Sequence, residues 1–297
     1  MPPRPDVRLA ITLGDPRGIG PEVVTKALAD PALAGRFTPV IVGPAGSGVE
    51  VHEPVGEWRP ELGAAEAGRL AGLAIERAVA LAAAGHVGGI VTAPIDKAAL
   101  LQGGFDHPGH TEMLAALTGS RVAMLLASDR LRVVLATTHV PLRDVPALVT
   151  AERIATVART TRKGLQDWFG IATPRIALCA LNPHAGDGGR FGSEDDDILA
   201  PVARAEQLSG PHPADTVFVR AIRGEFDAVI APYHDVGMTA VKVASFGQGV
   251  NVTLGLPFPR TSPDHGTALD IAGRGVADPA SMIRAIRMCA EIVDRMR

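Results

Sequence analysis

Three of the nine histidines share one local pattern, in which an apolar, strand-like run ends in a turn rich in Pro, Gly or Asp. They are His139, His184 and His234. Ligands of α/β sheets bind at the carboxyl ends of strands, where these imidazoles would converge. Three neutral imidazoles suit a divalent ion such as Zn²⁺ or Co²⁺ and leave positions open for a substrate. The alternative is that each histidine is hydrogen-bonded within its own loop, because their wide spacing is no local metal motif.

Polar residues that could bind an anion stand at two further places. His110 and Thr111 lie at the expected start of a helix, where Thr111 could cap the helix and the N-terminus could face an anion. An ordinary cap explains the same residues equally well. Later in the chain come Lys242, Asn251 and Arg260, the last followed by two hydroxyl residues, which together suit a phosphate or carboxylate. Each carries little weight alone, because isolated Lys and Arg are usually solvated.

Two glycine-rich segments point to ligand-shaped backbone. Residues 14–22 follow a strand and open a helix, but Val23 stands where the dinucleotide fingerprint needs its third glycine. No acidic residue ends the next strand either, so we do not expect a standard Rossmann fold. The segment is a tight strand–helix turn or a ligand contact through Asp15. The second segment, 265–275, reads as a loop shaped around a ligand, with a structural turn as the alternative.

These residues need a scaffold of alternating strands and helices. Apolar runs predict strands at 7–13, 38–43, 89–92, 175–181 and 227–231, and a hairpin of 122–127 with 132–137. Periodicity predicts helices at 21–30, 61–84, 95–101, 150–169 and 278–296, with Thr150 as a possible cap. The alternation predicts an α/β fold. Residues 44–60 are a linker or a surface loop.

Length and composition exclude several classes of protein. A chain of 297 residues predicts two domains or one large α/β unit. A net charge of −3 and 4% aromatic residues argue against nucleic-acid binding. The chain holds no apolar run long enough to span a membrane. Cys179 and Cys289 are too few and too far apart for a disulfide framework, and residues 1–5 hold no apolar signal segment. We therefore expect a cytoplasmic protein.

Taken together, these motifs resemble the 4-hydroxythreonine-4-phosphate dehydrogenase family of vitamin B6 biosynthesis. The matching stretches are 12–22, 92–97, 109–112, 135–144, 181–189, 213–216, 233–237 and 249–275. The last stretch also resembles the cofactor loop of isocitrate and isopropylmalate dehydrogenases, whose fold this family shares. The resemblance implies a two-domain architecture of that kind with an interdomain cleft. Residues 1–118 plus 247–297 would carry the cofactor loop, and 119–246 the metal ligands and the dimer interface.

The resemblance also implies a role for each matching residue. The three histidines would ligate one divalent ion, Zn, Co, Mg or Mn. The substrate contacts would be His110, Thr111, Lys242, Asn251 and Arg260, with the acidic Asp215 near the metal. The adenosine part of NAD or NADP would meet His265, Gly266, Thr267 and Asp270, and Asp270 would repel a 2′-phosphate and so favour NAD. The family forms a homodimer with a shared active site, in which His234 would come from the partner of the subunit supplying His139 and His184.

The implied reaction is the oxidation of a phosphorylated small-molecule hydroxy acid. It converts 4-phosphohydroxy-L-threonine at C3 into a β-keto acid, which decarboxylates to 3-amino-2-oxopropyl phosphate, with Lys242 or Asp235 as the base. Residues 44–61 are short for this family, which leaves two sister activities open: oxidation of 4-phospho-D-threonate or erythronate, and of aromatic cis-dihydrodiols. Arg260 and His110 favour a phosphorylated substrate. A non-redox metal-dependent lyase or binding protein is the alternative from another class.

Overall fold

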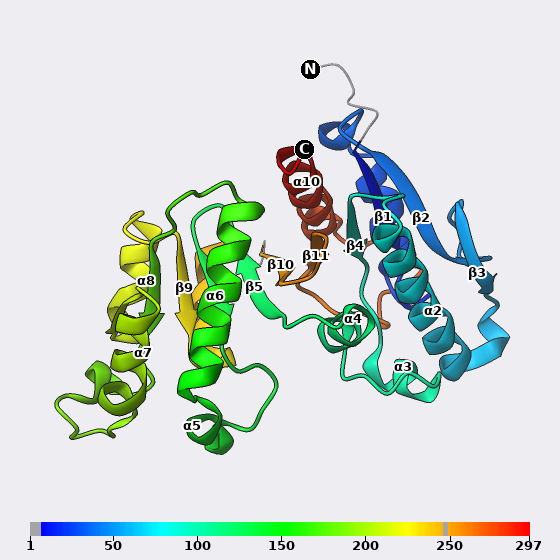
Figure 1. The fold of residues 1–297 in the computed structure, drawn as a ribbon. Coiled ribbons are helices and arrows are strands. Elements are labelled where there is room, and N and C mark those ends of the chain that lie inside the picture. Colours follow the sequence, from blue (N-terminus) through cyan, green and yellow to red (C-terminus); the bar gives the residue numbers. More distant parts are fainter. Residues whose placement is uncertain (1–6, 246–248) are drawn as a thin grey trace. The chain divides into compact units, whose positions relative to one another are not determined.

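The computed structural model describes residues 7–245 and 249–297. The chain divides into two compact units (Figure 1). The first runs to Ser120 and resumes from Leu256 to Arg297, and the second runs from Arg121 to Gly255. We expected domain boundaries after residue 118 and between residues 246 and 247, and the second boundary lies outside the described residues. The N-terminal segment 1–5, in which the sequence analysis found no apolar signal segment, also lies outside them. Strand β10 (Val250–Leu254), which that division gave to the first domain, pairs with β5 of the second unit.

The first unit is built on a parallel sheet with the strand order β3-β2-β1-β4-β11. Its strands are β1 (Arg8–Thr12), β2 (Thr38–Ala45), β3 (Glu53–Glu57), β4 (Gly89–Thr92) and β11 (Arg260–Pro263). Its helices are α1 (Gly20–Leu28), α2 (Gly63–Ala83), α3 (Lys97–Gln102), α4 (His110–Thr118) and α10 (Ala280–Arg295). Helix α2 packs on β1 and β2, and α10 packs on β4 and β11. Parallel strands buried in this way place their carboxyl ends, and the turns that follow them, along one edge.

The second unit has a mixed sheet with the order β10-β5-β6-β9-β7-β8. Its other strands are β5 (Ala123–Ala127), β6 (Arg132–Leu135), β7 (Ile176–Cys179), β8 (Ser209–His212) and β9 (Ala228–Ala231). Its helices are α5 (Val145–Leu148), α6 (Ala151–Asp167), α7 (Ala200–Ala205), α8 (Ala214–Ile222) and α9 (His234–Ser245). Strand β5 runs antiparallel to β10 and β6, whereas β6, β9, β7 and β8 are parallel. The polar turns after β6, β7 and β9 therefore leave the sheet at the same edge.

The core of the second unit follows the alternation of side chains along its strands. Val133 and Leu135 of β6 and Val229 of β9 pack with Phe218 of α8 and Val241 of α9. Successive side chains point to opposite faces, and the residues between them are buried as well. Helices therefore cover both faces, with α6 packed on β5, β6 and β10. Such two-sided burial is typical of parallel strands and holds their ends in a fixed register.

The predicted α/β class is confirmed, and so are the main helices and the hairpin. Met124 of β5 pairs antiparallel with Leu135 of β6. The Thr150 hydroxyl caps α6 by accepting a hydrogen bond from the backbone N–H of Arg153 at 3.3 Å. The interpretation of 44–60 as a linker or a loop was wrong, because Glu53–Glu57 forms the edge strand β3. Thr111 is not a cap either, since α4 begins at His110 without a side-chain cap.

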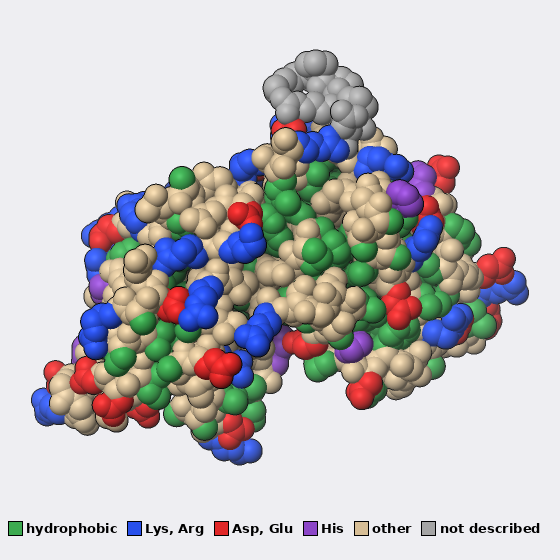
Figure 2. Space-filling view, in the orientation of Figure 1, with side chains coloured by type: hydrophobic (Ala, Val, Ile, Leu, Met, Phe, Trp, Pro, Cys, Tyr) green, Lys and Arg blue, Asp and Glu red, His purple; other side chains and the backbone are tan. Residues whose placement is uncertain are grey.

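Acidic and basic side chains are interspersed on the face of the molecule in Figure 2, as the near-neutral composition leads one to expect. Among the described helices, none is long and apolar enough to cross a membrane.

Candidate functional site

The turns after β6 and β9 bring two of the three predicted histidines together. The strands are adjacent and parallel, and their ends are joined by the backbone N–H of Ala136, which donates to the carbonyl of Ala231 at 2.9 Å. The buried Thr137 hydroxyl also donates to the carbonyl of Pro232 at 2.8 Å. These bonds fix the two turns against each other. The rings of His139 and His234 lie with their centroids 5.5 Å apart.

This spacing fits two ligands of one metal ion. Two imidazoles on a tetrahedral ion, with metal–nitrogen bonds of about 2 Å, have ring centres roughly 5 Å apart. The pair lines a cavity of about 160 Å³ together with Thr138, Tyr233 and Asp235. The Asp235 carboxylate can only accept, so His234 Nδ1 donates to it at 2.7 Å. That bond leaves Nε2 as the coordinating atom, which is the usual arrangement of a ligand histidine.

His184 stands on a strained turn after β7. His184, Ala185 and Asp187 have φ values of 53°, 56° and 45°, and Gly186 between them has 82°, so the backbone makes a left-handed turn. A left-handed run of residues other than glycine costs free energy and persists only where the surroundings impose it. The buried carboxylate of Asp195 imposes it here by accepting the backbone N–H groups of Leu181 and Asn182 at 2.8 and 2.9 Å.

The described residues of one chain contain no group of three or more His, Cys, Asp or Glu that could hold a metal. The resemblance paired His139 with His184 in one subunit. Within one chain His139 lies beside His234 and the described residues place no third such ligand with them, so which subunit supplies each histidine stays a prediction. The other predicted residues of the second unit stand on three different elements. Asp215 is in the first turn of α8, and Lys242 lies on α9 two turns beyond His234. Asn251 is on β10, and its buried side-chain oxygen has no hydrogen-bond partner among the residues that the structure describes.

In the first unit, the buried Arg260 lies within electrostatic range of the half-buried His110. Arg260 opens β11, is 1% exposed and donates from Nη2 to the Thr92 hydroxyl at 2.5 Å. Burial lowers the pKa of Arg260 to about 9, while Glu112 opposes that shift. Burial, followed by the charges of Arg260 and Lys97, holds the pKa of His110 well below 6.5. His110 is therefore neutral, and its buried Nε2 has no hydrogen-bond partner within residues 7–245 and 249–297.

An unsatisfied buried nitrogen beside a buried cation indicates a ligand that is itself anionic and rich in oxygen. Thr111 follows His110 in the first turn of α4. The predicted trio of His110, Thr111 and Arg260 thus belongs to one unit and includes a guanidinium, a group suited to binding anions.

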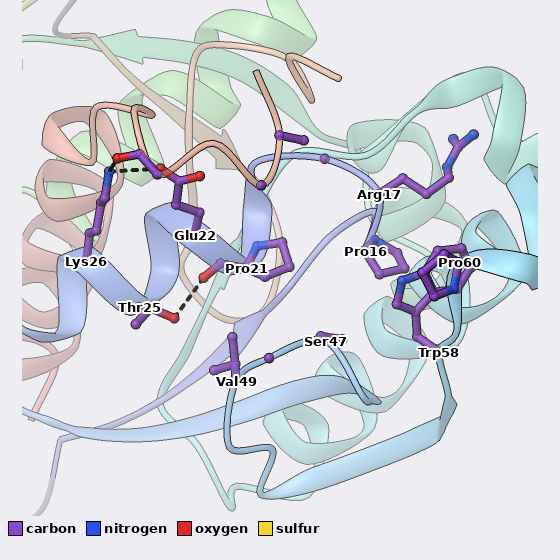
Figure 3. A pocket seen from close by; sticks show the side chains of 15 residues that line it. Pro16, Arg17, Pro21, Glu22, Thr25, Lys26, Ser47, Val49, Trp58 and Pro60 are labelled. Atoms are coloured by element: carbon purple, nitrogen blue, oxygen red, sulfur yellow. Dashed lines mark hydrogen bonds and ion pairs between the residues drawn. The ribbon is translucent and has the colours of Figure 1, made fainter. Parts of the chain in front are cut away.

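The first unit also contains a cavity of about 720 Å³ (Figure 3). Its walls are the turn after β1, the first turns of α1, residues around Ser47–Val49 and Trp58–Pro60, and the loop around Ala272–Gly275. The predicted loop 265–275 therefore does reach a cavity large enough for part of a dinucleotide. Its contributors are Ala272, Gly273 and Gly275, however, and the predicted His265, Gly266, Thr267 and Asp270 are not among the described lining residues.

The loop and the glycine-rich turn fit against each other closely. The backbone N–H of Ile19 donates to the carbonyl of Thr267 at 2.9 Å, and a Cβ on Gly18 would lie 2.8 Å from that same oxygen. Asp15 is fully buried and is bound by Arg17 through Nε at 3.0 Å and Nη2 at 2.6 Å. The turn is therefore both a tight strand–helix connection and a cavity wall, and sequence reasoning had treated these as alternatives.

The sequence analysis missed Glu22, Lys26 and Trp58 as cavity residues. Glu22 and Lys26 lie one turn apart on α1, and Figure 3 shows them side by side, across the cavity from Trp58. Their spacing of four residues on a helix was the available signal, since an acid and a base at that distance pair on one face. Nothing in the sequence showed that this face borders a cavity.

Comparison with known proteins identifies close relatives over the whole chain. A model of the family described as pyridoxal phosphate biosynthetic protein PdxA matches residues 37–289. The 4-hydroxythreonine-4-phosphate dehydrogenase of Erythrobacter litoralis is 44% identical over 333 aligned residues, which cover 99% of this chain and 98% of that protein. A Bradyrhizobium diazoefficiens protein provisionally named D-threonate 4-phosphate dehydrogenase is also 44% identical, with 94% of each chain covered. The crystal structure of 4-hydroxythreonine-4-phosphate dehydrogenase from Klebsiella pneumoniae has a TM-score of 0.86 at 39% identity, covering 97% of this chain and 98% of that one.

Proposed function

The chain belongs to the PdxA family of pyridoxal phosphate biosynthetic proteins, and we propose from this that it oxidises 4-phosphohydroxy-L-threonine at C3 with NAD or NADP and a divalent metal. It is a dehydrogenase, like the relatives that share its full length. Besides membership of the family, one observation supports the proposal. The rings of His139 and His234 lie with their centroids 5.5 Å apart, and both residues line one cavity.

A divalent metal and a nicotinamide would supply complementary chemistry. The metal, when bound, acts as a Lewis acid on the substrate hydroxyl, and the nicotinamide accepts a hydride. His139 and His234 would hold the metal, because their donor atoms and spacing fit it. Zn, Co, Mg and Mn all remain candidates. The cavity beside α1 would hold the adenosine part of the dinucleotide.

The chain's own residues bind and orient the substrate. Arg260 would hold the phosphate oxygens, with Thr111 and the neutral His110 as further hydrogen-bonding partners. Asn251 would offer its buried oxygen to a substrate donor, and Asp215, in the first turn of α8, would add a carboxylate. Fixing the phosphate at a distance from the reacting carbon supplies orientation.

A base must take the proton of the C3 hydroxyl while the hydrogen on C3 leaves as hydride and a C=O bond forms. Of the two candidates, Asp235 already accepts from His234 Nδ1, which gives it an orienting role. We therefore assign the proton to Lys242 Nζ. The product is a β-keto acid, which loses CO₂ to give 3-amino-2-oxopropyl phosphate.

We further propose a homodimer with a shared active site. His139 and His234 approach each other within one chain, whereas His184 does not join them. A second copy would then supply His184 as the third ligand, instead of supplying His234. The compartment we propose is the cytoplasm, where the free, buried Cys179 and Cys289 remain reduced.

A second activity has one specific observation in its favour, namely the relative provisionally named D-threonate 4-phosphate dehydrogenase. That substrate carries a hydroxyl where 4-phosphohydroxy-L-threonine carries an amino group, so both would use the same phosphate and C3 contacts. A cis-dihydrodiol lacks the phosphate and would leave Arg260 without an anion.

The test offers metal-loaded protein 4-phosphohydroxy-L-threonine and 4-phospho-D-threonate in parallel, each with NAD or NADP and with or without a chelator. Reduction of the nicotinamide with the first substrate, lost in chelator, supports the proposal. Turnover of only the second would replace the substrate. Normal binding of metal and nicotinamide without turnover of either substrate would favour a non-redox role.

A further inference from the structure

Glu22, on the wall of the cavity beside α1, has one carboxylate oxygen without a hydrogen-bond partner in the part of the chain that the structure describes. Glu22 Oε1 accepts from Lys26 Nζ and from the backbone N–H of Ala277, both at 2.8 Å. Glu22 Oε2 is buried and makes no hydrogen bond of good geometry among the described residues, although the nearby backbone N–H of Gly275 also helps to lower the pKa of the carboxylate. Glu22 also lines the cavity. A buried acceptor on a cavity wall indicates that a ligand donates a hydrogen bond there.

Lys26, the cation beside Glu22, has its hydrogen bonds satisfied. An ammonium group has three donors. Those of Lys26 reach Glu22 Oε1 at 2.8 Å, the carbonyl of Gly275 at 2.9 Å and the carbonyl of Ala277 at 2.8 Å. Lys26 therefore ties the loop to α1 and has no N–H left for a phosphate.

Arg17, the other cation of the cavity wall, is held by acids as well. It binds Asp15 through Nε and Nη2, and its Nη2 lies 3.3 Å from Asp96 Oδ2. Both cations among the described lining residues are thus paired with carboxylates. A phosphate monoester carries about −1.5 to −2 charges at neutral pH. Both of these cations are already paired with carboxylates, so neither would balance the charge of such a phosphate.

Glu22 itself stays ionised at neutral pH, because the hydrogen bond from Lys26, opposed in part by desolvation, lowers its pKa. An ionised carboxylate accepts a hydroxyl proton and repels a phosphate. Asp270, to which the sequence analysis gave this role, is exposed and outside the described cavity lining.

We propose that Glu22 selects NAD against NADP, with its Oε2 accepting a hydrogen bond from a hydroxyl of the adenosine ribose. The inference rests on the proposed function, since it requires that this cavity take the adenosine half of a dinucleotide. It goes further by assigning the choice of cofactor to one residue of α1.

The experiment measures equilibrium binding of NADH and NADPH to the full-length protein by nicotinamide fluorescence, without substrate turnover. The variant is Glu22→Gln, which keeps the side chain's size and an oxygen for the N–H of Ala277 but removes the charge. The matched control is Glu66→Gln, because Glu66 pairs with Arg69 on α2 outside the cavity lining. A second variant, Glu22→Asp, keeps the charge.

The parent protein is expected to bind NADH more tightly than NADPH. Glu22→Gln should reduce that preference by about tenfold or more, as expected for loss of a charge-assisted hydrogen bond and of a repulsion. Glu66→Gln should leave the preference unchanged, and Glu22→Asp should still reject NADPH. An unchanged preference in folded Glu22→Gln overturns the inference alone. If the parent binds neither dinucleotide, the cofactor cavity itself and the inference both fail.

Discussion

The carboxylate of Asp195 accepts the backbone N–H of Asn182 at 2.9 Å, two residues before His184. It accepts the N–H of Leu181 as well, and it is completely buried. One side chain thus holds the segment that enters the left-handed turn at His184. We regard Asp195 as a positioning residue for a metal ligand, since its contacts reach that ligand only through the backbone.

Replacing Asp195 with Asn tests this role. The amide presents N–H groups where the carboxylate presented an acceptor, so one buried backbone N–H loses its partner at a cost of about 1–3 kcal/mol. Urea unfolding should show that loss of stability, and titration with Zn²⁺ or Co²⁺ should show weaker metal binding. Asp196→Asn, which changes an exposed neighbour, is the control. Equal metal affinity in folded Asp195→Asn and the control would contradict the positioning role.

Mixing inactive variants tests where the metal ligands come from. If His139 and His234 act in one chain and His184 in the other, mixed dimers of His184→Ala with His234→Ala contain one intact site. Activity should therefore reappear on mixing, up to half that of the parent per mixed dimer. Mixing His139→Ala with His234→Ala should restore nothing, because each site then lacks a ligand. Recovery in this second mixture would instead place His234 in the partner, as the resemblance implied.

Replacing Arg260 with Met separates stability from binding. Burial of its charge lowers the pKa of Arg260 to about 9, so burying this cation disfavours the folded state. Replacement by an apolar side chain should leave the thermal midpoint unchanged or higher. Affinity for the phosphorylated substrate should fall by about 10- to 100-fold, as expected for a lost charged hydrogen bond. A large fall in stability with unchanged substrate affinity would assign Arg260 a structural role only.

His110, whose Nε2 is buried, predicts a pH-dependent stability. In the folded protein the pKa of His110 is well below 6.5, chiefly because of burial. In the unfolded chain this histidine has its ordinary pKa of about 6.5. The unfolded state therefore binds more protons as the pH falls below about 6.5, and stability is lost in that direction. Denaturant unfolding at neutral and mildly acidic pH should show a smaller decrease for His110→Gln than for the parent. A His107→Gln control should keep the parent's decrease, and the same decrease in all three proteins would refute the assignment.

The sequence predicted elements well where periodicity and burial agree. Strand β4 (Gly89–Thr92) is a short, fully buried apolar run, and its limits were predicted without error. Edge strand β3 was missed because Pro54 and Gly56 disfavour strands and the segment is half exposed. Strand β11 was missed because its residues Arg260 to Pro263 are polar for a buried strand, although each of them is buried.

The site was predicted in part for a similar reason. His139 and His234 follow adjacent parallel strands, so the local pattern was sufficient to place them at one edge. Glu22 was missed because its role depends on a contact with a distant segment of the chain. The backbone N–H of Ala277 donates to one carboxylate oxygen and not to the other, and such a contact produces no local sequence pattern. Asp270 was predicted from a motif, but the loop leaves it exposed.

The central claim is a metal-dependent oxidation of 4-phosphohydroxy-L-threonine that depends on His139 and His234. The most direct measurement is nicotinamide reduction with that substrate by the parent and by His234→Ala, each assayed with Zn²⁺, Co²⁺, Mg²⁺ or Mn²⁺ and after chelation, with His86→Ala as the control. The parent and the control should turn over the substrate, lose turnover in chelator and regain it with metal, whereas His234→Ala should show no turnover. Chelator-resistant turnover, or full activity of His234→Ala, would contradict it.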